Sequence, residues 1–128
     1  MKNYRRGVAP LGYKWVWNVS KGNKLEKKLE VDHETAGVVK LIFDRYAQLK
    51  SLLKLSKLLT KLGKKTINNN NFNKETLAKI LRNPIYKGFV KDVNGDLKID
   101  AELIIIPDHI YDECRRIAVN NYKRKFDD

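Results

Sequence analysis

The sequence predicts an α+β domain that is mainly helical, with a helix-turn-helix-like core and small β-hairpins. Three observations lead to this prediction. Apolar residues recur at helical spacing in several segments, and runs of β-forming residues flank two turn sequences. The 128 residues, of which 42% are hydrophobic, are enough for one modest core. We therefore expect a single domain over residues 13–128, preceded by a basic arm or linker over residues 1–12.

The first β-hairpin is predicted over residues 13–31. Two runs rich in β-forming residues flank the turn Ser20–Asn23 there. The first run contains Trp15 and Trp17. Because a small domain commonly buries its large aromatic side chains, we expect both in the core rather than at a surface where bases would stack on them.

The next two segments predict helices over about 33–49 and 52–62. Asp32 and Ser51 are good N-cap residues for them, and Gly63 suits the left-handed position that follows a helix. The second helix has the clearest amphipathic pattern, because leucines recur at i, i+3, i+4 and i+7. The inward residues expected from this pattern are Leu55, Leu58, Leu59 and Leu62.

A polar loop with the asparagine run Asn68–Asn71 then leads to a third helix over about 74–82. Asn73 is its expected cap, and Pro84 ends it because proline disfavours helical geometry in the preceding residue. The turn signal Asn94-Gly95 predicts a second hairpin over residues 85–99. A last helix is expected over 108–122.

The charge is strongly positive and unevenly distributed. Lys and Arg number 27 against 15 Asp and Glu, so the formal net charge is +12. Two basic blocks alternate with nearly neutral or acidic ones, and the block from Lys54 to Lys91 has 10 basic residues and 1 acidic residue. Such a field attracts polyanions, of which nucleic acid is the commonest.

Other features exclude several classes of protein. The single cysteine, Cys114, rules out an intramolecular disulfide and a cysteine zinc cluster, and it fits a reducing cytosolic compartment. No apolar run approaches the roughly 20 residues of a membrane span. We expect no cofactor and no metal site, because two lone histidines, His33 and His109, have no ligand spacing. We also expect no catalytic residue, since no serine has an evident activating environment.

The second and third predicted helices form a helix-turn-helix-like unit, although their connection is longer than usual. Its third helix carries Asn, Lys, Arg and acidic side chains suited to base edges in the major groove. The lysines before it and one after it are expected to contact phosphates, and the arginines of the arm to reach the minor groove. The predicted DNA-binding residues are Arg5, Arg6, Lys54, Lys57, Lys61, Lys64, Lys65, Asn73, Lys74, Glu75, Thr76, Lys79, Arg82 and Lys87.

Several segments resemble one family. G-V-A-P-L-G-Y at Gly7–Tyr13, V-K-L-I-F-D-R-Y at Val39–Tyr46, F-N-K-E-T-L at Phe72–Leu77 and I-L-R-N-P-I-Y-K-G at Ile80–Gly88 are similar to the recombinase domain of large serine recombinases. The resemblance covers roughly Arg5 to Arg124. It implies a domain that binds duplex DNA at an attachment site during integration or excision of a mobile element. Dimers or tetramers would form only through other regions of the full-length recombinase.

The sequence also departs from the family. Leu11 and Phe72 replace an aromatic residue and a common tryptophan, and asparagines replace the Pro, Arg and Gly usual in the loop before the third helix. We expect this chain to lack the catalytic domain and the zinc ribbon of the family, so the fragment itself is expected not to be an enzyme. The alternative is a non-catalytic protein-interaction or RNA-binding module, and an RNA role would require exposed stacking aromatics.

Overall fold

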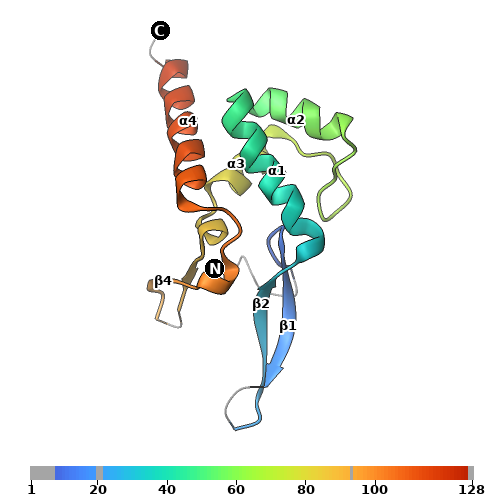
Figure 1. The fold of residues 1–128 in the computed structure, drawn as a ribbon, viewed down its shortest axis with the longest axis vertical. Coiled ribbons are helices and arrows are strands. Elements are labelled where there is room, and N and C mark those ends of the chain that lie inside the picture. Colours follow the sequence, from blue (N-terminus) through green and yellow to red (C-terminus); the bar gives the residue numbers. More distant parts are fainter. Residues whose placement is uncertain (1–7, 20–21, 93, 127–128) are drawn as a thin grey trace.

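The computed structural model describes residues 8–19, 22–92 and 94–126. Figure 1 shows an elongated molecule with a cluster of helices at one end and a β-hairpin projecting from the other. The elements, in chain order, are β1 (Tyr13–Val19), β2 (Leu25–Val31), α1 (His33–Leu49), α2 (Leu52–Lys61), α3 (Lys74–Arg82), η1 (Pro84–Lys87), β3 (Phe89–Lys91), β4 (Leu97–Ile99), η2 (Ala101–Leu103) and α4 (Asp108–Phe126). The mainly helical α+β fold predicted from the sequence is confirmed.

The helices begin where their capping residues predict. The side chains of Asp32, Ser51 and Asn73 accept hydrogen bonds from backbone N–H groups in the first turns of α1, α2 and α3. Gly63 follows α2 with φ of 75°. α4 continues to Phe126, beyond the predicted end at residue 122. The prediction for Leu62 is wrong: its side chain is 50% exposed, because α2 ends at Lys61 and the apolar stripe stops with it.

Four aromatic rings join the helical end of the molecule, formed by α1, α2, α3 and α4, to the base of the β1–β2 hairpin. Tyr86 lies 5.6 Å from Tyr13 and 5.8 Å from Phe43, and Phe43 lies 5.9 Å from Tyr111, all between ring centroids. The Tyr86 hydroxyl donates to the carbonyl oxygen of Leu11 at 2.7 Å. Since these rings come from β1, α1, η1 and α4, this one cluster fixes the position of the elements around α3.

The segment Ile85–Val90, predicted as the first strand of a hairpin over 85–99, is mostly not a strand. Pro84–Lys87 forms the 3₁₀ helix η1, and β3 begins only at Phe89. Asn83 explains this, because its side chain accepts from the N–H of Ile85 and caps the turn. Gly88 then ends η1 in the left-handed region, with φ of 94°. The antiparallel pairing of β3 with β4 around the Asn94-Gly95 turn is confirmed.

The β1–β2 hairpin pairs antiparallel from Tyr13 opposite Val31 to Val19 opposite Leu25. The expectation that both tryptophans lie in the core is wrong for Trp17, which is 66% exposed, while Trp15 is half-buried. The reason is geometric: the hairpin extends beyond the helices, as Figure 1 shows, so only its base packs on the core. The Lys27 ammonium lies 5.8 Å from the centroid of the Trp17 ring.

Candidate nucleic-acid interface

α3 presents its polar residues to solvent because its apolar residues are confined to one side. Leu77 and Leu81 are buried, at 0% and 2% exposure, and hold the helix on the core. The residues predicted to read bases lie on the rest of its surface. Those exposed are Asn73, Lys74, Glu75, Lys79 and Arg82, and Thr76 is half-buried.

The exposed side of α3 is divided into two rows. Lys74, Ala78 and Arg82, at four-residue spacing, line a groove that also borders α4, while Lys79 is not among the residues that line it. Within the described ranges, no carboxylate forms an ion pair with Lys74, Lys79 or Arg82. These three positive charges therefore have no ion-pair partner among the described residues, and Glu75 is the one carboxylate on this short helix.

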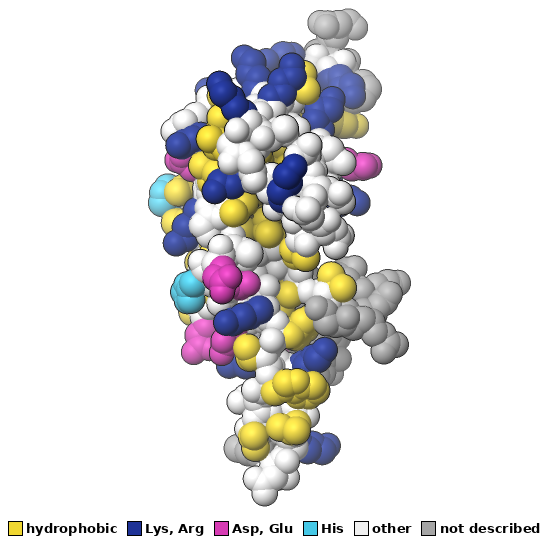
Figure 2. All heavy atoms as spheres, turned by 90° about the vertical axis from the view of Figure 1, so that its right-hand side faces the viewer, with side chains coloured by type: hydrophobic (Ala, Val, Ile, Leu, Met, Phe, Trp, Pro, Cys, Tyr) yellow, Lys and Arg dark blue, Asp and Glu magenta, His cyan; other side chains and the backbone are white. Residues whose placement is uncertain are grey.

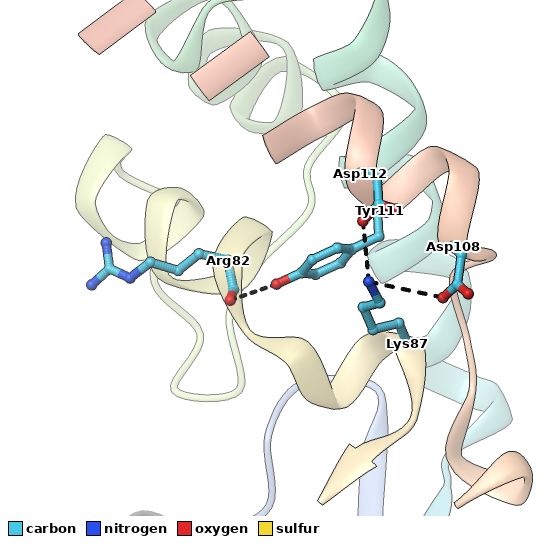
Figure 3. Close-up of polar contacts among 5 residues, drawn as sticks. All are labelled: Arg82, Lys87, Asp108, Tyr111 and Asp112. Atoms are coloured by element: carbon cyan, nitrogen blue, oxygen red, sulfur yellow. Dashed lines mark hydrogen bonds and ion pairs between the residues drawn. The ribbon is translucent and has the colours of Figure 1, made fainter. Parts of the chain in front are cut away.

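The C-terminal end of α3 is tied to α4. The Tyr111 hydroxyl of α4 donates to the backbone carbonyl oxygen of Arg82 at 2.6 Å. Figure 3 shows that the Arg82 guanidinium extends away from this contact. Burial raises the pKa of Tyr111 above its ordinary value of 10.0, so the hydroxyl remains a donor at neutral pH. The contact fixes the backbone of Arg82 and leaves its side chain available.

Lys87, a predicted phosphate contact, is engaged within the protein. Its ammonium lies 3.1 Å from an Asp112 carboxylate oxygen and 4.0 Å from one of Asp108 (Figure 3). It also lies 4.9 Å from the centroid of the Tyr111 ring, and its side chain is only 16% exposed. Its charge is thus already compensated, and a phosphate would compete with these carboxylates for it.

The lysines of α2 lie opposite its buried leucines. Leu55 and Leu59 are buried, whereas Lys54, Lys57 and Lys61 are exposed. Figure 2 shows Lys and Arg side chains gathered over the helical end of the molecule. These three lysines form an accessible basic face, as the amphipathic pattern predicts.

The loop between α2 and α3 is closed by its own hydrogen bonds. Thr66 N–H donates to the carbonyl oxygen of Asn70 at 2.8 Å, and the Lys65 ammonium donates to the Asn71 side chain at 2.6 Å. The Ser56 hydroxyl of α2 donates to the carbonyl oxygen of Phe72 at 2.6 Å. Lys65 is exposed and Lys64 is half-buried. The asparagine run thus forms an ordered turn before the residues of α3 that are predicted to read bases.

The groove beside α3 contains basic residues that the sequence reasoning missed. It has a volume of about 980 Å³ and lies between α3, α4 and the junction of α1 with α2. Lys50, Arg115 and Arg124 line it together with Lys74 and Arg82. The sequence from Asp92 onward is acidic as a whole, with 6 basic and 9 acidic residues, so its composition does not indicate a basic cluster. The available signal was the order of charges along α4, where Asp108, Asp112 and Glu113 precede the basic residues.

No metal site is evident: within residues 8–19, 22–92 and 94–126, no group of three His, Cys, Asp or Glu side chains could hold a metal ion. His33 and His109 are exposed in the first turns of α1 and α4. No helix in these ranges is long and apolar enough to cross a membrane. Arg5 and Arg6 lie outside the described residues.

Comparisons with known proteins agree with this fold. Residues 33–118 match the Recombinase family. A structure of an LSR–DNA complex has a similar fold, with a TM-score of 0.66 and 23% identity over 89% of this chain. A structure concerned with the sequence requirements of the Listeria innocua prophage attP site also has a TM-score of 0.66, with 22% identity over 91% of this chain.

The chain spans 32% and 46% of the length of those two structures. No curated protein matches the chain. The family match covers most of the described helices and includes the I-L-R-N-P-I-Y-K-G segment that surrounds the end of α3. The chain therefore belongs to the Recombinase family.

Proposed function

We propose that this domain binds duplex DNA and recognises an attachment site of a mobile element for integration or excision. The observation that carries the proposal is the set of exposed positive charges on α3 that form no ion pair within the described residues, contributed by Lys74, Lys79 and Arg82. The similarity of the fold to that of an LSR–DNA complex supports it. A short helix with exposed cations and a rigid attachment at both ends suits insertion into a major groove.

In this proposal, α3 reads base edges. Lys79 and Arg82 donate to guanine O6 and N7, and Glu75 accepts from a cytosine amino group, with Thr76 at the margin. Asn73 pairs with adenine once the bond that its side chain accepts from the Thr76 N–H is exchanged. Phosphate contacts come from the lysines at positions 54, 57, 61, 64 and 65, and from Lys87 once its carboxylate contacts are exchanged. Arg5 and Arg6 enter the minor groove.

The proposal also gives this domain a place in a recombinase. A domain that grips one site in a fixed register positions whatever is attached to it over a defined stretch of DNA. We propose that cutting and rejoining of strands, and assembly into dimers or tetramers, belong to other parts of a full-length recombinase. The domain itself then contributes binding and no catalytic group.

The test is fluorescence anisotropy of labelled duplexes, with attachment-site and random sequences at two salt concentrations. Lys79→Ala and Arg82→Ala are each expected to cost about 1–3 kcal/mol on the site and to relax preference at particular bases. Lys57→Ala and Lys61→Ala are expected to weaken binding to every sequence alike. Unchanged affinity and selectivity in both classes would contradict the assignment of this face.

One observation favours a second candidate function, the binding of single-stranded nucleic acid. Trp17 is 66% exposed and has the Lys27 ammonium over its ring, which provides a stacking surface beside a positive charge. Competition by single-stranded DNA and RNA against labelled duplex distinguishes the candidates. If single strands compete better than duplex and Trp17→Ala abolishes their advantage, the hairpin and not α3 is the binding element.

A further inference from the structure

All charged side chains that line the groove between α3 and α4 are positive. Lys74 and Arg82 come from α3, Lys50 from the α1–α2 junction, and Arg115, Arg124 and Lys125 from α4. Among the described residues that line the groove there is no carboxylate. Six cations from three segments line one hollow, so the groove is an environment for an extended anion rather than for a single ion.

The uncharged lining of the groove is largely apolar. It includes the small side chains of Ala78, Ala118 and Val119 and the larger, exposed side chains of Leu53 and Tyr122. These side chains present C–H groups to a ligand chain that lies among the cations. A sugar-phosphate backbone has this composition, with charged oxygens on one edge and apolar deoxyribose carbons on the other.

The position of the groove relative to α3 sets which part of the duplex reaches it. The row Lys74, Ala78 and Arg82 is both a flank of the proposed recognition helix and a wall of the groove. A helix in a major groove, which is about 12 Å wide, has phosphates of the bordering strands along its flanks. With α3 inserted, one of those strands lies on the side of α4.

We infer that the groove binds the sugar-phosphate backbone of one DNA strand bordering α3, and that Arg115 and Arg124 of α4 contact its phosphates. This inference rests on the proposed function and extends it to a helix whose surroundings in sequence are acidic. α3 reads bases while Arg115 and Arg124 of α4 hold the adjacent strand. Because α3 also lines this groove, the base contacts of α3 and the phosphate contacts of α4 position the duplex together.

α4 supplies its own matched control. Arg116 and Lys123 are sequence neighbours of Arg115 and Arg124, are exposed, and do not line the groove. Arg116 instead pairs with Glu113, at 2.5 Å. The variant Arg115→Gln/Arg124→Gln and the control Arg116→Gln/Lys123→Gln each remove two positive charges from the same helix, so their effects on the long-range field are alike.

The experiment measures the salt dependence of duplex binding by the whole chain and both double variants. For the groove variant, the slope of log K against log salt is expected to fall by about 2, close to 1 for each phosphate that the variant no longer neutralises. The control is expected to keep a slope near that of the wild type. The ratio of site to random-sequence affinity stays unchanged in both, because phosphate contacts carry no sequence information.

Three results would overturn the inference, and they are distinguishable. Equal slopes for the two double variants, in chains that melt at the wild-type temperature, show that only net charge matters. A changed preference among sequences in the groove variant shows a base contact instead. Absence of wild-type binding to any duplex at low salt overturns the proposed function, and the inference falls with it.

Discussion

The helical end and the hairpin end of the molecule expose different kinds of side chain. On α2, α3 and the C-terminal half of α4, more than half of the exposed side chains are lysine or arginine, with Leu53, Val119 and Tyr122 as the large apolar or aromatic exceptions. On the β1–β2 hairpin, the large side chain at the base is buried, Tyr13 at 4% exposure, whereas Trp17 at 66% and Val19 at 60% are exposed farther along the strand. Figure 2 shows the two regions at opposite ends of one face.

This difference separates two physical roles. Because most apolar residues of the helical end are buried, its surface is mainly positively charged. Such a surface attracts a polyanion, and the binding depends on salt. The hairpin tip buries little, so it contributes little to folding free energy and leaves apolar area in water. Stability and DNA binding are therefore both expected to depend on the helical end, and the hairpin tip is expected to be separable from both.

The largest expected effect compares a core ring with a tip ring. Phe43 is 0% exposed and contacts the rings of Tyr86 and Tyr111, so Phe43→Ala should lower the free energy of unfolding by about 3–5 kcal/mol. Trp17→Ala should change it by no more than about 0.5 kcal/mol. Urea unfolding followed by circular dichroism measures both. A loss of several kcal/mol on removal of Trp17 would mean that the tip is packed in solution.

An intermediate effect is expected at Gly88, where η1 turns toward β3. Its φ is 94°, and an added Cβ would lie 2.7 Å from Ile104 Cγ1 and 3.0 Å from the Asp100 carbonyl oxygen. Gly88→Ala should therefore destabilise the fold by about 1–3 kcal/mol. Gly95, in the exposed turn, has a similar φ of 84° with nothing within 4 Å of an added Cβ.

Gly95→Ala is the control for backbone strain, and its cost should be the smaller of the two. Comparison of the thermal unfolding of Gly88→Ala and Gly95→Ala separates the cost of backbone strain at positive φ from the cost of the steric clash of the added Cβ. Equal losses would show that positive φ alone accounts for the effect and that Ile104 moves aside without cost.

The smallest effect at neutral pH concerns Cys114, in the core between α4 and α1. Burial raises the pKa of its thiol from 9.0 to about 11, and its Sγ donates to the Phe43 carbonyl oxygen at 3.4 Å. The unfolded chain ionises first as pH rises, so this contribution to stability is complete below pH 9.0 and is lost toward about pH 11. Burial also raises the pKa of Tyr46 and Tyr111, which act in the same direction.

Cys114→Ala separates the thiol from these tyrosines. Unfolding free energies of wild type and variant, compared between pH 7 and 11, should differ in slope only above about pH 9. A parallel pair of curves across the whole range would contradict the assigned role of the thiol. At neutral pH the thiol should also resist alkylation as long as the helical end stays folded.

The sequence was most informative where local chemistry decides the structure. Asp32, Ser51 and Asn73 cap the helices that they predict, since a cap acts through backbone N–H groups only two or three residues away. η1 was missed because Ile85 and Tyr86 favour strands in general, whereas here burial in the core and the Asn83 cap win. The prediction for Trp17 was wrong because the alternation of side chains along a strand indicates which face of the hairpin a residue lies on. It does not show whether another layer covers that face.

The candidate interface was predictable in part for the same reason. The exposed side of α3 follows from helical spacing within nine residues. Arg115 and Arg124 were not expected, since they approach Lys74 and Arg82 only through packing of α4 on α3. The engagement of Lys87 by Asp112, 25 positions away, likewise depends on tertiary structure.

The hydrogen bond from Tyr111 to the Arg82 carbonyl oxygen has a consequence for the thermodynamics of binding. Together with the Lys87–Asp112 ion pair, it fastens α4 to the end of α3. On the other side, the Asn121 side chain donates to the Lys50 carbonyl oxygen at 3.0 Å and holds α4 to the α1–α2 junction. The spacing of the cations is thus preorganised, and the entropy of ordering their backbone is lost during folding rather than upon association.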